Sequence, residues 1–261
     1  MHGSNVHYLS ATRPSGPPSG QDKQSLHDEV CASSASVAKM LEQLSTKLSP
    51  VRRVVHAGEA VFQSGERFTH LYIVNSGVFK IVNFSPDGRE QVAALKFRGD
   101  WLGFDAIAQG RHQCDAIALD PCEVWLTRYE VLLQAIMGDA ELMNQFHRAM
   151  SREIANERDA LLSICTLPAD ARVADFLRFW VASQARSGLR VDCISLYASR
   201  AEIANHLGLT VETVSRALSK LQRSGLISIS ERGRREIAIS DIDALTAYVH
   251  RCGVSVLALE H

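Results

Sequence analysis

The side chains best suited to recognition chemistry lie on one face of a short amphipathic segment, residues 211–223. Apolar residues recur at helical spacing on one face of this segment, and the opposite face is polar: Glu212, Ser215, Arg216, Ser219 and Arg223. An arginine can donate two hydrogen bonds to guanine O6 and N7, and a carboxylate can accept one from the cytosine amino group. Arg216 and Glu212 are therefore candidates for reading bases in the major groove of DNA, and the Ser215 hydroxyl can adapt to either base.

Two short helices must position this face. Ser199 and Glu202 have the spacing of a capping box, which predicts the start of a first helix. Gly208 ends that helix, and Thr210 can cap the second one. Two helices joined by a short turn that contains glycine form the helix-turn-helix arrangement of DNA-binding proteins.

A β-hairpin is expected directly after the second helix. Residues 226–230 and 236–240 alternate apolar and polar side chains on either side of an arginine-rich turn. Such a hairpin is typical of a wing that contacts the DNA backbone. The residues expected to contact DNA are Ser199, Thr210, Glu212, Thr213, Ser215, Arg216, Arg223, Arg232 and Arg234.

The charge distribution favours a local surface for nucleic acid. The 261 residues carry 28 Lys and Arg against 29 Asp and Glu, a net charge of -1, which excludes a uniformly basic nucleic-acid coat. Residues 199–235 contain seven basic and three acidic residues, a local charge of +4, so the remainder of the chain sums to -5. DNA phosphates would therefore meet a basic surface near the C-terminal end.

The N-terminal half has a different pattern. Residues 1–30 are polar and rich in proline, glycine and serine, which predicts a disordered leader. Apolar residues at spacings of three and four predict a short helix over residues 37–48. Short β-branched and aromatic runs separated by glycine-containing turns fill residues 51–126, which predicts an antiparallel sandwich or barrel.

A long helix is expected after this barrel, because residues 140–164 contain neither proline nor glycine. Its heptad seam consists of Met143, His147, Met150, Ile154, Glu157, Leu161 and Ile164. This seam favours a homodimer joined by a coiled coil, although one helix packed on its own barrel could show a similar stripe. An acid at Glu157 would repel its symmetry mate and weaken the dimer until a signal reorients the helices, unless its side chain reaches solvent.

These segments are similar in sequence to the CRP/FNR family of bacterial transcription regulators. SRAEIANHL and GLTVETVSRALSKLQRSGLI resemble the family's helix-turn-helix, and residues 65–110 resemble its jelly-roll sensory domain. The resemblance implies an α+β fold with an N-terminal cyclic-nucleotide-binding-like β jelly roll, a long dimerisation helix and a C-terminal winged helix-turn-helix. Residues 211–216 follow the FNR branch, whose members bind palindromes with TTGAT half-sites. The turn at Ser85, Asp87 and Gly88 resembles the loop through which relatives contact RNA polymerase.

The family's ligands are not expected here. Cyclic nucleotide binders carry a Gly-Glu pair and an Arg-Ser or Arg-Thr pair, whereas Gly103 is followed by Phe104 and residues 111–115 lack the second pair. The iron-sulfur relatives use four cysteines, but the leader offers Cys31 alone and Trp125 occupies the barrel position. We therefore expect neither cyclic AMP nor an iron-sulfur cluster, and no metal site. A thiol redox switch or a haem ligand among the cysteines and His112 stays open.

The expected organisation is a leader over residues 1–30, a sensory barrel over 31–138, a dimerisation helix over 139–167, a winged helix-turn-helix over 168–250 and a tail over 251–261. Export and membrane-spanning segments are absent from the sequence, which favours a cytoplasmic protein.

No P-loop, GxGxxG, HExxH or GxSxG motif occurs, so an enzyme is not expected. We expect a DNA-binding activator that works as a homodimer with RNA polymerase. The alternative is a metabolite-sensing or thiol-redox-sensing barrel that acts mainly through protein contacts.

Overall fold

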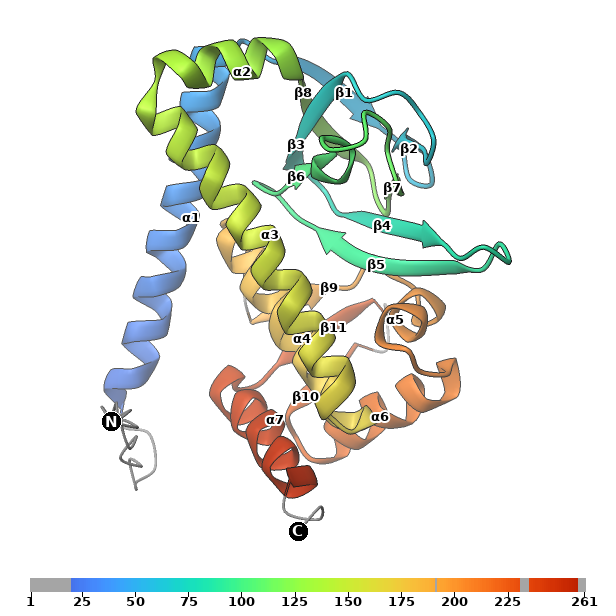
Figure 1. Ribbon diagram of the computed structural model, residues 1–261. Coiled ribbons are helices and arrows are strands. Elements are labelled where there is room, and N and C mark those ends of the chain that lie inside the picture. The colour runs from blue at the N-terminus through green and yellow to red at the C-terminus, as the bar shows by residue number, and fades with distance from the viewer. Residues whose placement is uncertain (1–19, 191, 231–234, 258–261) are drawn as a thin grey trace, which may run out of the picture.

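The computed structural model describes residues 20–190, 192–230 and 235–257 (Figure 1). Two four-stranded antiparallel sheets face each other in its N-terminal half, with strand orders β1-β8-β3-β6 and β2-β7-β4-β5. The strands are β1 (Val51–Val55), β2 (Ala60–Phe62), β3 (His70–Ser76), β4 (Phe79–Phe84), β5 (Glu90–Lys96), β6 (Trp101–Leu102), β7 (Asp115–Ala118) and β8 (Cys122–Arg128). Alternating side chains such as Phe62, Val74 and Phe79 fill the space between the sheets. The predicted jelly-roll domain is confirmed.

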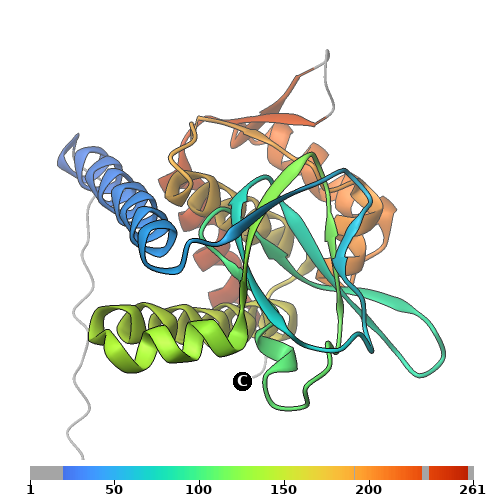
Figure 2. The same ribbon diagram turned by 90° about the horizontal axis from the view of Figure 1, so that it is seen from above.

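Three helices cover one side of this barrel in both Figure 1 and Figure 2: α1 (Gly20–Leu48), α2 (Tyr129–Gly138) and α3 (Ala140–Thr166). Leu41 and Leu44 of α1 pack with Leu132 of α2 and with Leu142 and Phe146 of α3. Asp139 caps α3 by accepting hydrogen bonds from the backbone N–H groups of residues 141 and 142. The helix expected after the barrel is therefore present, and it is anchored at its N-terminal end.

Helix α1 begins earlier than the sequence predicts. Residues 20–30 were expected to belong to a disordered leader but are helical, so that part of the prediction is wrong. Residues 1–19 lie outside the described residues. The segment after Gly20 contains no proline or glycine, and extending the packed half of a helix costs less free energy than nucleating a new one.

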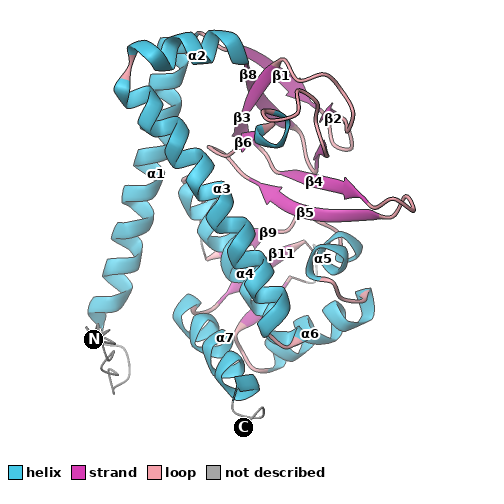
Figure 3. Ribbon diagram, viewed as in Figure 1, coloured by secondary structure: helices cyan, strands magenta, loops and turns pink. Residues whose placement is uncertain are grey.

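The C-terminal half is a helical domain with a small sheet (Figure 3). Its elements are α4 (Ala169–Arg186), β9 (Cys193–Ser195), α5 (Arg200–Leu207), α6 (Val211–Arg223), β10 (Ile227–Ile229), β11 (Glu236–Ile239) and α7 (Ile242–Leu257). The strands pair antiparallel in the order β10-β11-β9. Helix α7 continues beyond residue 250, so the predicted tail begins too early in the sequence. None of the described helices combines the length and apolarity needed to cross a membrane.

Candidate nucleic-acid interface

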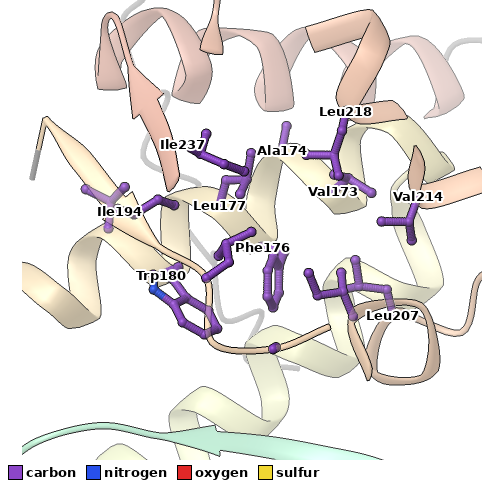
Figure 4. Close-up of a cluster of buried hydrophobic side chains, with 14 of the residues drawn as sticks. Val173, Ala174, Phe176, Leu177, Trp180, Ile194, Leu207, Val214, Leu218 and Ile237 are labelled. Atoms are coloured by element: carbon purple, nitrogen blue, oxygen red, sulfur yellow. The ribbon is translucent and has the colours of Figure 1, made fainter. Parts of the chain in front are cut away.

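The C-terminal core holds the two short helices against α4. Figure 4 shows Phe176, Leu177 and Trp180 of α4 facing Leu207, Val214 and Leu218 of the helix pair, with Ile194 and Ile237 from the sheet. Trp180 is fully buried, as are Val214 and Leu221 on the inner face of α6. Burial of these large apolar groups fixes α6 relative to α4 and leaves its outer face in solvent.

The first of the two helices, α5, is bounded by specific backbone geometry. The Ser199 hydroxyl accepts a hydrogen bond from the Glu202 N–H at 3.2 Å, and the Ser199 N–H donates to a Glu202 carboxylate oxygen at 2.8 Å. This is the predicted capping box. Gly208 then ends the helix in the left-handed conformation, with φ of 64°, which is unfavourable for a residue with a Cβ.

Thr210 caps α6 through its hydroxyl, which accepts a hydrogen bond from the Thr213 N–H at 3.1 Å. The Thr210 and Thr213 hydroxyls also lie 2.8 Å apart. Both side chains therefore hold the start of the helix. The N-terminus of a helix attracts anions, so this end of α6 is suited to a backbone phosphate.

The outer face of α6 presents the residues predicted to read bases. The Arg216 and Glu212 side chains are 71% and 76% exposed, and they form an ion pair with each other at 3.1 Å. An exposed pair one helical turn apart contributes little free energy, so both groups can turn to a partner at small cost. The Ser215 hydroxyl donates to the Val211 carbonyl at 2.9 Å and keeps its acceptor sites.

An apolar side chain on this face was missed in the sequence analysis. Val211, the first residue of α6, is 47% exposed although it is apolar. A methyl-bearing side chain at the start of a reading helix can contact the C5-methyl group of thymine. Val211 continues the three-and-four spacing of Val214, Leu218 and Leu221, so the sequence pattern alone does not signal its exposure.

The wing is described only in part. Strands β10 and β11 form the predicted hairpin, in which Ile229 pairs with Ile237. Arg232 and Arg234 lie outside the described residues, so their assignment stays a prediction. Arg223 is exposed. It lies in the last turn of α6, at the opposite end of the helix from Thr210.

The seven seam residues of helix α3 differ in their surroundings. The exposed residues that form a partly apolar stripe are Met143, His147, Ile154 and Leu161. Met150 is partly buried and packs against the cluster that α1, α2 and α3 form, and Ile164 is partly buried at the lining of a cavity. Glu157 lines the same cavity, but it is exposed. Successive seam residues lie about 40–60° apart around the helix, so one edge of the stripe meets its own chain while the other stays in solvent.

The turn between β4 and β5 is exposed and internally hydrogen-bonded (Figure 1). Ser85 donates to the Asp87 carboxylate, and the Arg89 guanidinium lies 2.7 Å from the other Asp87 oxygen. These hydrogen bonds lower the pKa of Asp87, and the one from Ser85 has the largest effect. Gly88 follows with φ of 80°. The turn predicted to contact RNA polymerase is thus exposed and carries its own hydrogen bonds.

The barrel region that corresponds to the family's nucleotide site is occupied by its own side chains. Asp105 accepts hydrogen bonds from the Gln113 N–H at 2.7 Å and from the Cys114 thiol at 3.4 Å. The His112 ring stacks on Phe62 with centroids 3.7 Å apart, and a Cβ on Gly103 would lie 3.3 Å from that ring. The Asp105 carboxylate therefore accepts hydrogen bonds from residues 113 and 114, in the segment that lacks the Arg-Ser or Arg-Thr pair.

The barrel thiols are unsuited to ionisation. Burial raises the pKa of Cys114 strongly, and the neighbouring Asp105 carboxylate raises it further. Burial and Asp120 raise the pKa of Cys122 to about 12. Since the thiolate is the reactive form and the metal ligand, both groups are poor nucleophiles in this conformation. Among the side chains that the structure describes, no three His, Cys, Asp or Glu groups come together as a metal site would require.

The sensory barrel contacts α5 directly, and apart from Glu202 of the capping box the residues of this contact were not predicted from the sequence. Strand β5 is an edge strand, and the Asn205 side chain binds its backbone: Oδ1 accepts from the Val92 N–H at 2.6 Å, and Nδ2 donates to the Glu90 carbonyl at 2.8 Å. Lys80 of β4 pairs with Glu202 at 2.7 Å. Burial alone would raise the pKa of Glu202, but hydrogen bonds from Lys80 and Ser199 lower it. This barrel–α5 contact consists of Lys80, Glu90, Val92, Glu202 and Asn205.

Comparisons with known proteins agree with this architecture. The Crp-like helix-turn-helix domain matches residues 171–248, and the cyclic nucleotide-binding domain matches residues 52–139. The regulatory protein HlyX of Actinobacillus pleuropneumoniae is 31% identical over 195 residues, which cover 75% of this chain and 80% of HlyX. The fumarate and nitrate reduction regulatory protein of Salmonella typhi is 33% identical over 196 residues, 75% of this chain and 77% of that protein.

Solved structures show the same fold. FixK2 from Bradyrhizobium japonicum superposes with a TM-score of 0.67 and 28% identity, covering 76% of this chain and 96% of FixK2. A CRP-family transcriptional regulator from Thermus thermophilus superposes with a TM-score of 0.62 at 22% identity, covering 76% of this chain and 96% of that one, which is a likeness of fold. The order of barrel, long helix and helix-turn-helix is therefore shared with known regulators.

Proposed function

Because the chain belongs to the CRP/FNR family of transcription regulators, we propose that it is a homodimeric activator that reads a TTGAT-type palindrome. Its relatives named above are regulators. Each subunit places α6 in a major groove, and the two α3 helices set the distance between half-sites. The DNA target places the protein in the cytoplasm. The α6 face that holds Glu212, Ser215 and Arg216 in solvent is the observation that carries this proposal.

Roles follow for the individual residues of this face. Arg216 donates to guanine, Glu212 accepts from a cytosine amino group, and Ser215 contacts an outer base. Ser199 and Thr210, at the N-terminal ends of α5 and α6, receive the phosphates that fix the register, together with Thr213, Arg223, Arg232 and Arg234. The pattern Val211 to Arg216 follows the FNR branch of the family.

Dimerisation is supported by the exposed stripe on α3. Ile154 is 54% exposed and Leu161 is 61% exposed on a helix that carries neither glycine nor proline. Large apolar side chains in regular spacing on one long helix are stabilised by a second copy of that helix. A twofold dimer also matches the twofold symmetry of a palindrome.

Activation is supported by the β4–β5 turn. Ser85, Asp87 and Gly88 lie in the turn that joins β4 and β5 of the barrel, whereas the reading face lies on α6 of the C-terminal domain. The Asp87 side chain is 56% exposed, and its carboxylate is bound by Ser85 and Arg89. We assign this turn to contact with RNA polymerase.

The proposal does not include cyclic AMP or an iron-sulfur cluster. The Asp105 carboxylate takes the hydrogen bonds that a cyclic phosphate would need, and no Arg-Ser pair follows in residues 111–115. The second candidate is a barrel that senses a metabolite, or senses redox state through its own thiols, and acts mainly through protein contacts. Against the redox sensor, the two buried barrel thiols have raised pKa values.

A gel-shift experiment tests the proposal. The full-length protein is titrated onto duplexes that carry a TTGAT palindrome, a TGTGA palindrome or a scrambled sequence, without cyclic AMP, at two salt concentrations. We expect tightest binding to the TTGAT duplex, by at least about 10³-fold over the scrambled one, with weaker binding at higher salt. A preference for TGTGA, or equal binding to all three duplexes, contradicts the proposal.

A further inference from the structure

A cavity of about 230 Å³ lies where the sensory barrel, α3 and the DNA-binding domain meet. One wall is the edge strand β5, a second is the C-terminal half of α3, and the others are α4 and α5. It is separate from the occupied region of the barrel around Asp105 and His112, neither of which lines it. A bound molecule would contact the barrel, α3, α4 and α5 at once.

The inner surface of this cavity is largely apolar. Leu95 and Leu207 are buried at its floor, and Phe176 and Phe179 contribute aromatic surface. His206 also lines it, with its Nδ1 3.0 Å from the Val92 carbonyl. Burial lowers the pKa of His206, so this imidazole is neutral at pH 7. The floor can therefore receive an aromatic or aliphatic group without burying a charge.

The charged groups around the cavity are unequal in sign. Lys96 pairs with Glu153, and Arg178 pairs with Asp175 at 2.8 Å, so both cations are neutralised. The two other carboxylates, Glu157 and Asp159, are exposed and form no ion pair with a described residue. The lining thus has four acids against two bases. An anionic ligand such as a nucleotide would be repelled, while a cation would be attracted.

We propose that this cavity binds a small organic cation with an apolar body, such as an aryl-alkyl ammonium compound. The apolar body lies against Leu95, Phe176 and Phe179, and the ammonium group lies at the opening beside Glu157 and Asp159. The apolar area supplies the affinity and the two carboxylates supply the selectivity for charge.

Calorimetric titration of the full-length protein without DNA tests the site directly. Phenethylamine is the probe, and 2-phenylethanol and phenylacetate present the same ring with a neutral and an anionic end. We expect affinity to fall in that order, with the amine at least about tenfold above phenylacetate. Equal binding of the amine and phenylacetate, or no binding of the amine at millimolar concentration, overturns the proposal.

Variants locate the site. Ala160 lies on α3 and lines the cavity, so Ala160→Leu fills it and abolishes amine binding while keeping a good helix former. The pair Glu157→Gln and Asp159→Asn weakens amine binding about two- to tenfold, as expected for two exposed ion pairs, and leaves 2-phenylethanol binding unchanged. Glu42→Gln, an exposed acid on α1, is the control. Amine binding that survives Ala160→Leu places the ligand elsewhere and overturns the proposal.

The coupling to DNA rests on the proposed function and is measured separately. Because the cavity walls join β5 to α4 and α5 in the arrangement that leaves α6 exposed, bound amine raises DNA affinity, and DNA raises amine affinity by the same factor. Gel shifts with and without phenethylamine measure this, with Ala160→Leu expected to lose the response. Unchanged DNA affinity at saturating amine overturns the coupling, whereas lack of any DNA binding contradicts the proposed function alone.

Discussion

At the scale of single residues, the exposed face of α6 combines strong recognition chemistry with weak internal attachments. Arg216 and Glu212 neutralise each other across one helical turn, in solvent, at 3.1 Å. Such a pair keeps both side chains extended on the same face, yet it can be exchanged for hydrogen bonds to bases at a cost below about 1 kcal/mol. The free protein is thereby prepared for DNA without a buried charge.

Replacement of Arg216 by alanine tests the role of its guanidinium. Loss of a bidentate contact to guanine is expected to weaken binding to the TTGAT duplex by about 1–3 kcal/mol and to relax the preference at one base pair. Gel shifts against duplexes with each base at that position measure both effects. Arg190→Ala removes an equally exposed arginine outside the reading face and is the control. Uniform weakening across all four duplexes would reassign Arg216 to a phosphate contact.

His206 predicts a pH dependence of stability. Burial lowers the pKa of its imidazole below the unfolded value of about 6.5, so the unfolded chain binds the additional proton. The free energy of unfolding is therefore expected to fall as pH decreases from about 7.5 to about 5.5, by up to about 1.4 kcal/mol per pH unit for this group. Urea unfolding of the native protein and of His206→Gln measures it. An identical slope in both proteins would exclude His206 as the source.

At the scale of elements, α3 divides its surface between two partners. Leu142 and Phe146 bury one stripe against α1 and α2, and Ile154 and Leu161 expose a neighbouring stripe. A regular heptad in the sequence is compatible with both, because the two stripes lie only about a quarter-turn apart around the helix. The exposed stripe is the surface available to a second subunit.

A charge placed on this stripe is expected to separate the subunits. Ile154→Lys introduces two like charges into a symmetric apolar contact and should weaken the dimer by at least about 2 kcal/mol, with loss of binding to the palindrome. Sedimentation equilibrium measures the dimer. Ala155→Lys adds the same charge at the next exposed position, outside the stripe, and should leave the dimer intact. Equal effects of the two variants would contradict the assigned interface.

At the scale of the whole molecule, the edge of the sensory barrel and the first helix of the DNA-binding domain form one continuous contact. Asn205 satisfies the backbone of the edge strand at Glu90 and Val92, which also protects that edge from pairing with another chain. Glu202 at once caps α5 and binds Lys80 of the barrel. A change in the position of β4 or β5 therefore reaches the capping residue Ser199.

Asn205→Ala is expected to loosen this contact, by about 1–3 kcal/mol, because two backbone groups of β5 lose their partners. Hydrogen exchange at the Val92 amide should accelerate. Affinity for the palindrome should also fall, because a mobile DNA-binding domain must be ordered when it binds. Asn83→Ala, on the exposed side of β4, serves as the matched control. Tighter DNA binding by Asn205→Ala would show instead that the contact inhibits DNA binding by the helix-turn-helix.

Local patterns were enough to predict much of this molecule from sequence. The capping box at Ser199, the turn at Gly208 and the cap at Thr210 act within a few residues, so they specify the two helices directly. Alternation of apolar residues likewise predicted the barrel and the wing. The start of α1 was missed, because the polar residues 20–30 show no regular spacing of apolar side chains. These residues extend a helix whose C-terminal half is packed against α2 and α3.

Only the tertiary structure decided which residues from distant segments meet. Asn205 and Val92 are separated by 113 positions, and neither carries a local signal for the other. Ile164 fits a heptad, but the rotation of α3 against the barrel turns it toward the cavity, and Glu157 lies at the exposed edge of the same cavity. Caps and turns depend on neighbouring atoms along the chain, whereas interfaces and cavities depend on how rigid elements pack. The sequence alone therefore determined the reading helix, and packing determined what controls its position.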